Sequence, residues 1–186
     1  MPEQTPVTVG VNDVQVKQLS ACESALVLAK RQKDQAGHLL IALSRDGDPM
    51  VRIRAAECLM EIGGERAVIG LMGLLDDPHT QVRITAIGAL GVLRAHGARD
   101  KLLAVLKSDP EVPVRIIAAR TLGRMGNRTG LLLILRLLDE DNEFYQRLAV
   151  MALRDIIGQT FSPTREGIRS AKRYLDMSLD RYLNGG

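Results

Sequence analysis

Hydrophobic and polar positions recur along this chain with a period of 31 or 32 residues. An Asp stands six residues before an Arg in four places, and successive copies are 31, 32 and 32 residues apart. The four pairs are Asp46/Arg52, Asp77/Arg83, Asp109/Arg115 and Asp141/Arg147. Self-similarity at such a period is typical of a stacked array of repeats rather than of a domain with one closed core.

Four apolar columns keep the same step as the Asp/Arg pairs. They are Leu40/Leu71/Leu103/Leu135, Leu43/Leu74/Leu106/Leu138, Leu28/Leu59/Leu90/Leu122 and Ile53/Ile84/Ile116/Leu148. The first two columns lie three residues apart in every copy, which puts both side chains on one face of a helix. Each repeat is therefore predicted to contain a helix that ends near the Asp.

A turn and a second helix follow the Asp of each copy. In the first copy the turn reads DGDP, which predicts Asp48 as the N-cap of the next helix and Pro49 as its first residue. That helix carries small residues, such as Ala55 and Ala56, which allow close approach of a neighbouring helix. It is predicted to end near a glycine that suits a C-terminal cap, namely Gly63, Gly97, Gly126 and Gly158 in the four copies.

The pattern predicts an all-α fold, an α-α superhelix of about five helical pairs. A pair of antiparallel helices buries its apolar faces only when neighbouring pairs stack on it. The predicted pairs span residues 13–45, 48–76, 80–108, 111–139 and 142–184, which together form a single repeat domain over 13–184. Residues 1–12 are predicted to be a flexible tail, and residues 162–184 a capping helix that begins at Ser162 and Pro163.

Two of the copies, DGDPMVRIRAAECLMEIG and DPEVPVRIIAARTLGRMG, resemble HEAT repeats, specifically the short class first noted in phycobilisome bilin lyases. The resemblance covers roughly residues 20 to 158 and implies a HEAT-like solenoid. It implies architecture more than function, because many unrelated scaffolding proteins share the motif. A role as an accessory subunit of a bilin-lyase-like enzyme is one alternative, and it would require a partner lyase or a co-purifying pigment.

Composition narrows the class of protein. Aromatic residues make up 3% of the chain and Trp is absent, so the apolar residues suit close-packed helices better than a β-sandwich. The formal net charge of +3 is mildly basic, well below the charge of a dedicated nucleic-acid binder. Cys22 and Cys58 do not form a disulfide framework, and no apolar run reaches the roughly 18 residues that cross a bilayer. These features predict a reduced, cytoplasmic protein.

The Arg column has two interpretations. Four arginines in register can bind a row of phosphates, or each can pair with the Asp of its own or the neighbouring repeat. The Asp column keeps the same step as the Arg column, and the planar guanidinium suits a two-bonded pair with a carboxylate. We therefore predict ion pairs that join the turns.

A strip of apolar side chains is predicted on the exposed side of the second helix in each pair, where a solvated strip would be mostly Lys, Glu, Gln or Arg. We predict that the strip lines the concave surface and binds a partner helix or peptide, with Lys101 and Arg136 orienting an acidic group. The candidate partner-binding residues are Ile41, Ile69, Met72, Lys101, Leu133, Arg136 and Leu137. As alternatives, the N-terminal segment covers this strip, or a second copy does so in a homo-oligomer.

The predicted C-terminal helix carries a basic stripe. Its members are Arg165, Arg169, Lys172 and Arg173. A charged face on a capping helix is usually solvated, and the nearby Asp176 dilutes this one. The alternative is that the stripe contacts nucleic acid, as some HEAT-like DNA-repair proteins do by gripping the backbone, with an affinity that falls steeply with salt.

No residues in the sequence predict catalysis or a cofactor. His38, His79 and His96 lie in different repeats and lack the spacing of metal ligands, so no metal site is predicted. There is no Gly-rich phosphate loop after a strand, and no Ser/His/Asp or Cys/His arrangement. We therefore predict a non-catalytic protein-protein interaction scaffold.

Overall fold

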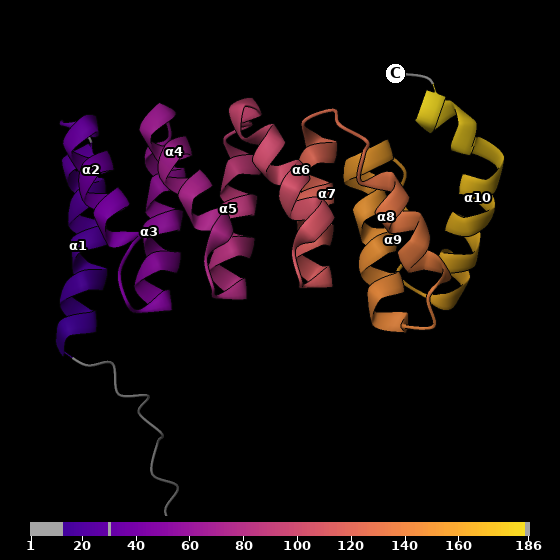
Figure 1. Ribbon diagram of the computed structural model, residues 1–186, viewed down its shortest axis with the longest axis horizontal. Helices are drawn as coiled ribbons and strands as arrows, with labels where there is room; N and C mark the ends of the chain where they lie inside the picture. Colours follow the sequence, from indigo (N-terminus) through magenta and orange to yellow (C-terminus); the bar gives the residue numbers. More distant parts are fainter. Residues whose placement is uncertain (1–12, 30, 185–186) are drawn as a thin grey trace, which may run out of the picture.

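The computed structural model describes residues 13–29 and 31–184, which form α-helices and two short 3-10 turns and contain no strand (Figure 1). The α-helices are α1 (Asp13–Ala29), α2 (Lys33–Leu43), α3 (Pro49–Ile62), α4 (Glu65–Gly73), α5 (Thr80–Val92), α6 (Arg99–Ser108), α7 (Val112–Arg124), α8 (Leu131–Asp139), α9 (Glu143–Ile157) and α10 (Arg165–Asn184). The 3-10 turns are η1 (Leu74–Asp76) and η2 (His96–Ala98). The all-α prediction is confirmed, and the predicted tail lies outside the described residues.

The helices form five antiparallel pairs arranged in two layers. Odd-numbered helices pack on one another in one layer, and each even-numbered helix packs against the odd-numbered helix or helices beside it in the chain (Figure 1). The core lies between the layers, where Leu59, Leu90, Leu122 and Leu153 are fully buried at a step of 31 or 32 residues. The predicted α-α solenoid of five helical pairs is therefore confirmed.

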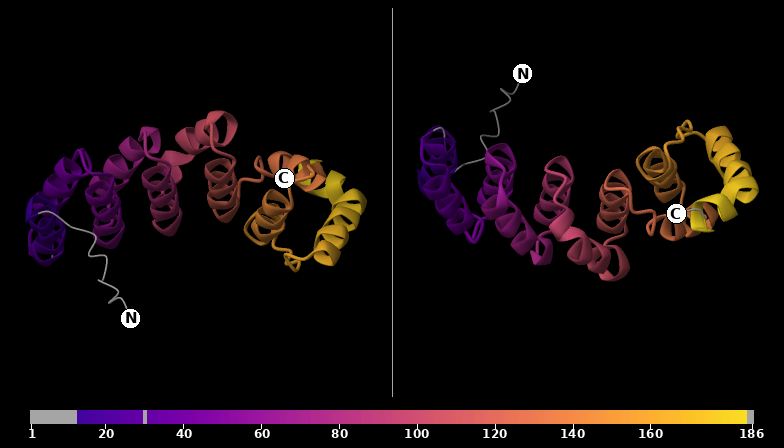
Figure 2. Two further views of the ribbon diagram at one scale, coloured as in Figure 1. Left: turned by 90° about the horizontal axis from the view of Figure 1, so that it is seen from below. Right: turned by 90° about the horizontal axis from the view of Figure 1, so that it is seen from above.

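The row of helices is bent, and the odd-numbered helices lie on its inner side (Figure 2). These helices contact each other along the whole row, whereas α6 makes little direct contact with α4 or α8. Small buried residues such as Ala55, Ala86 and Ala118 let the odd-numbered helices approach closely, so that layer is the shorter one. The prediction that the second helix of each pair lines the concave surface is therefore wrong, because those helices lie on the outer side.

The first residues of the helices show which residues of the four copies are equivalent, and the last copy differs from the sequence prediction. The fourth residue is Arg52 in α3, Arg83 in α5 and Arg115 in α7, but Gln146 in α9, so Arg147 is one residue out of the Arg column. Asp48 caps α3 through a 2.8 Å hydrogen bond from the Met50 amide, with Pro49 first in the helix, as predicted. One apolar column also differs from the prediction. Leu102 and Ile134 are fully buried where the column has the half-buried Leu103 and Leu135, whereas Leu106 and Leu138 are buried as predicted.

Helix ends agree with the sequence prediction in three of four copies. Gly63, Gly126 and Gly158 follow α3, α7 and α9 with positive φ angles of 58°, 80° and 76°. After α5, however, Arg94 takes the left-handed conformation with φ of 47°, and Gly97 lies in η2. The last helix begins at Arg165 rather than 162, because the Thr164 hydroxyl accepts a hydrogen bond from the Gly167 amide at 3.2 Å.

Candidate interaction surface

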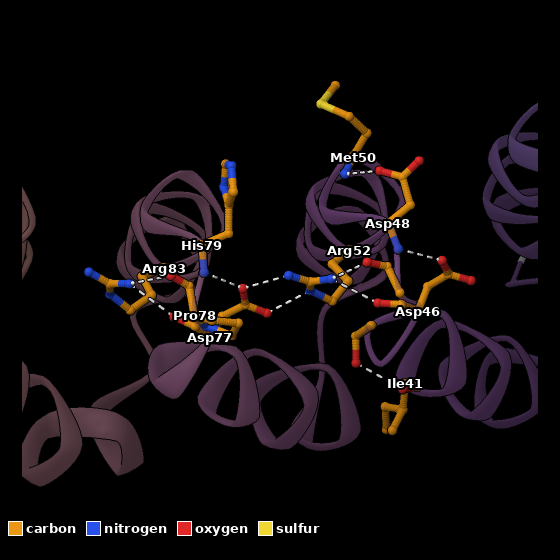
Figure 3. Close-up of polar contacts among 11 residues, drawn as sticks. Ile41, Asp46, Asp48, Met50, Arg52, Asp77, Pro78, His79 and Arg83 are labelled. Atoms are coloured by element: carbon orange, nitrogen blue, oxygen red, sulfur yellow. Dashed lines mark hydrogen bonds and ion pairs between the residues drawn. The ribbon is translucent and has the colours of Figure 1, made fainter. Parts of the chain in front are cut away.

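Two ion pairs join the turns of successive repeats, and Figure 3 shows the first of them, between Arg52 and Asp77. Arg52 donates from Nε and Nη2 to both carboxylate oxygens of Asp77, at 2.7 and 2.8 Å, and Arg83 binds Asp109 in the same way at 2.8 and 2.9 Å. The Nη1 atoms of both arginines donate to carbonyls of their own turns, from Arg52 to Asp46 and from Arg83 to Asp77, at 2.8 and 2.9 Å. Each arginine thus joins its own turn to the next one, and the predicted ion pairs are confirmed for these two arginines.

The two ion pairs, Arg52–Asp77 and Arg83–Asp109, are called the ladder below. Asp77 makes the stability that the ladder contributes depend on pH. Burial alone would raise the pKa of the Asp77 carboxyl. Hydrogen bonds from Arg52 and the His79 amide lower the pKa by more than burial raises it, so the pKa lies below its ordinary value. Such a carboxyl stabilises the fold above its unfolded pKa of about 3.9, and that contribution is lost as pH falls through the folded pKa. We expect urea unfolding to show stability falling below about pH 4, and Asp77→Asn to weaken this dependence. Identical pH profiles for the two proteins would contradict the assignment.

The ladder stops after two ion pairs. The Nε atom of Arg115 is buried and has no hydrogen-bond partner among the residues that the structure describes. In the next turn Gln146 donates from Nε2 to the carbonyl of Glu140 at 2.5 Å, which repeats the contact that Arg52 and Arg83 make with their own turns. Arg147 pairs instead with Glu143 at the surface, at 3.2 Å. The ion-pair prediction is therefore wrong for Arg115 and for the predicted Asp141/Arg147 pair.

The predicted strip lies on the outer layer and is partly exposed. On α2 and α4, Ile69 is 54% exposed, whereas Ile41 and Met72 are half-buried against the core. On α6, Lys101 is exposed, and its Nζ lies 3.4 Å from an Asp76 carboxylate oxygen. These four predicted residues share one side of three successive helices.

The strip prediction is less accurate on α8. Arg136 is exposed and Leu133 is half-buried, but Leu137 is only 2% exposed and belongs to the core. The exposed position assigned to Leu137 is therefore wrong. Leu137 is the seventh residue of α8, as the buried Val105 is of α6, and both side chains face the core. Leu132, which the prediction did not include, is the apolar side chain of α8 that is most exposed, at 52%.

Two grooves lie between successive outer helices, at the ends nearest the ladder. The first, of about 440 Å³, lies between α2 and α4, and the second, of about 430 Å³, lies between α4 and α6. Residues that line the first include Ile41, Ile69, Gly70, Gly73 and Arg52. Residues that line the second include Asp76, Arg83, Lys101, Ala104 and Val105. Each groove borders one buried ion pair, which fixes the backbone beside it.

The sequence analysis missed apolar residues on the odd-numbered helices. Met50, Val92, Phe144 and Met151 are each at least 50% exposed and lie on α3, α5 and α9. Met50 and Phe144 are the second residues of their helices, a coincidence visible in the sequence only once the helix starts are known. They define a second exposed surface on the inner layer.

The end of the array carries arginines where earlier repeats have apolar residues. Arg147 is the fifth residue of α9, the counterpart of Ile53, Ile84 and Ile116, which corrects the predicted use of Leu148 in that column. Ile116 is 1% exposed, whereas the side chain of Arg147 is 55% exposed. A cation at this position disfavours stacking of a further repeat, so the odd-numbered layer ends at α9.

Half of the basic stripe on α10 is neutralised. Arg165 donates from Nε to Glu143 at 2.7 Å, and the Nζ of Lys172 lies 3.0 Å from an Asp139 oxygen. Arg169 and Arg173 are exposed. The stripe thus holds α10 against α8 and α9, and no observation favours nucleic acid over solvent at the remaining two arginines.

Cys22 and Cys58 are free and fully buried, in α1 and α3. Within the described ranges, no group of three or more His, Cys, Asp or Glu residues is placed to hold a metal ion. No helix in the same part of the chain is long and apolar enough to cross a membrane.

Comparison with known protein families identifies the repeat. A family model of HEAT repeats matches residues 20–91 and 99–164. The matched segments include both ion pairs of the ladder and both outer grooves. No curated protein matches the chain. The predicted resemblance to HEAT repeats is confirmed, and the comparison with bilin lyases stays a prediction.

Proposed function

Because the chain belongs to the HEAT repeat family, whose repeats commonly serve as protein-interaction scaffolds, we propose that it is a non-catalytic scaffold that binds a helix or peptide of a partner protein. The observation that supports this most is the pair of grooves between successive outer helices. Ile69 is more than half exposed where a solvated surface would carry a polar residue. The predicted partner surface is therefore kept, but on the outer side of the bend.

The grooves suit a segment that runs across the outer helices. Packed helices are spaced by roughly 10 Å, which about three residues of extended peptide cover. An apolar side chain of the partner would contact Ile41 and Ile69 in the first groove, where Gly73 leaves room for its backbone. In the second groove, Lys101 and Asp76 form an exposed ion pair, and a charged group of the partner would take the place of one of the two residues.

Changing Ile69 to Asp should remove partner binding without unfolding the array. Its exposed side chain contributes little to the core, whereas a buried carboxylate in the complex costs several kcal/mol, enough for a loss of at least about a hundredfold in affinity. The measurement is affinity capture of the tagged full-length chain from the cells that produce it. Met151→Asp is the matched control, because Met151 is 50% exposed but lies on the inner layer.

Comparison of the two variants shows whether the partner binds the outer grooves or the inner layer. A partner kept by Met151→Asp and lost by Ile69→Asp supports the outer grooves, and the reverse result assigns binding to the inner layer. Retention of nucleic acid, or of a pigment with its lyase, in place of a protein partner would contradict the scaffold proposal. We further propose a reducing compartment such as the cytoplasm, since Cys22 and Cys58, whose thiols form a hydrogen bond with each other, form no disulfide.

A further inference from the structure

We propose that Arg115 and Arg136 form a binding site for an acidic side chain of the partner protein. The starting point is the buried Nε of Arg115, which has no hydrogen-bond partner among residues 13–29 and 31–184. A buried donor without an acceptor is costly, and native structures rarely keep one without a reason. Arg115 as a whole is half-buried, so part of the residue contacts solvent.

The other repeats show what an arginine at this position binds. Arg52 and Arg83 are also the fourth residues of their helices, and each holds an Asp carboxylate of the following turn through two hydrogen bonds. The same chemistry at Arg115 requires a carboxylate from the turn after α8. That turn offers Glu140 and Asp141, which are both exposed, and the Nε of Arg115 bonds to neither of them. Gln146 binds only the backbone carbonyl of Glu140. The intramolecular ligand is therefore missing, and a carboxylate from outside the chain can take its place.

A second cation stands on α8, the helix that follows Arg115 in the same repeat. Arg136 is exposed on α8 and forms no ion pair within the described part of the chain. It is the sixth residue of α8, as Ala104 is of α6, and Ala104 lines the second outer groove beside Arg83. The nearest acidic residue on α8, Asp139, is held by Lys172 at 3.0 Å. Two cations without carboxylates favour an acidic ligand.

An apolar residue beside the cations narrows the ligand further. Leu132 is 52% exposed and lies four residues before Arg136, one turn away on the same face of α8. A partner segment with a Glu or Asp next to a Leu, Ile or Val would bury Leu132 while its carboxylate meets Arg115 and Arg136. This inference extends the proposed scaffold by specifying the chemistry of its partner. Its test uses small peptides, so it does not depend on the Ile69 experiment.

The test follows the arginine Nε–H signals of the full-length, unaltered protein by NMR. The probe is acetyl-Leu-Glu-Leu-amide, and its matched control is acetyl-Leu-Gln-Leu-amide. We expect the Arg115 signal to move with saturation on addition of the Glu peptide, which should bind at least about tenfold more tightly than the Gln peptide. Arg52 and Arg83 should not move, because their hydrogen bonds are already made. Arg136→Gln should weaken binding of the Glu peptide by about tenfold without unfolding the protein, since Arg136 is exposed.

Three results would overturn the proposal. The first is an Arg115 signal that moves no more than that of the exposed Arg147, which would indicate unspecific attraction. The second is equal binding of the Glu and Gln peptides, which would leave only an apolar contact with Leu132. The third is unchanged binding in Arg136→Gln. If the peptides bind as expected while Ile69→Asp keeps its partner, the anion site stands and the outer grooves are not the docking surface.

Discussion

Replacing Asp109 with Ala should lower the free energy of unfolding by about 3–5 kcal/mol, the cost of leaving a buried charge without its partner. The side chains of Arg83 and Asp109 are 8% and 4% exposed, so water cannot replace the lost carboxylate. Asp109 also accepts from the Glu111 amide at 2.9 Å, and the variant loses this turn contact as well. The measurement is urea unfolding at neutral pH, followed by circular dichroism.

The control for this prediction is Asp76→Ala. Asp76 is also paired with a cation, Lys101, but its side chain is 80% exposed, and surface pairs contribute about 1 kcal/mol or less. A double variant of Arg83 and Asp109 should lose less free energy of unfolding than the two single variants together, because each single change already removes the same ion pair. If Asp109→Ala and Asp76→Ala destabilise the protein equally, the ladder does not stabilise the array.

Replacing Leu102 with Ala should lower the free energy of unfolding by about 2–5 kcal/mol, while the same change at the neighbouring Leu103 should cost less. Leu102 is fully buried, whereas Leu103 is half-buried at the edge of the core. The two variants differ by one position and remove the same atoms, so their difference reports the orientation of α6. Thermal and urea unfolding of both variants give the comparison.

The result at α6 bears on the whole array. Each repeat contacts only its neighbours, so a cavity in the middle weakens the stacking on both sides of it. Leu102→Ala should therefore also broaden the transition or divide it into two, since α1–α4 and α7–α10 lose their common support. An equal or larger loss at Leu103 would show that α6 is rotated from the orientation described above.

The period of the chain made its architecture predictable from sequence. Packing fixes the leucine columns and the Asp–Arg step, because Leu59, Leu90 and Leu122 must meet the same neighbours in every repeat. The caps at Asp48 and Gly63 are local, and their hydrogen bonds depend on few residues. Such features depend on the residues near them in the chain, so one sequence contains the information that predicts them.

The register of the last repeat was not predictable in the same way. Asp141 and Arg147 keep the spacing of the earlier pairs, but α9 begins at Glu143, where Asn142 caps it through hydrogen bonds from the Phe144 and Tyr145 amides. The cap sets the phase of α9, so Gln146 rather than Arg147 occupies the position of Arg52 and Arg83. A residue count along the chain cannot reveal which of two adjacent start sites the backbone uses.

The curvature was the other feature that the sequence left open. Which layer becomes the inner one depends on how closely the helices approach, summed over all contacts between repeats. At Gly123, for example, a side chain would collide with the Asp155 carbonyl on α9, so this glycine sets the distance between α7 and α9. The apolar strip was recognised, but its place on the outer side follows from such contacts.

The central claim is that partner binding occurs in the grooves between the outer helices. Its most direct test is photo-crosslinking in the cells that produce the protein, with a benzophenone amino acid in place of Ile69 or, as the matched position on the inner layer, Met151. We expect a covalent adduct with one discrete partner from position 69 and none with that partner from position 151. An adduct from position 151 alone would contradict the claim and assign binding to the inner layer.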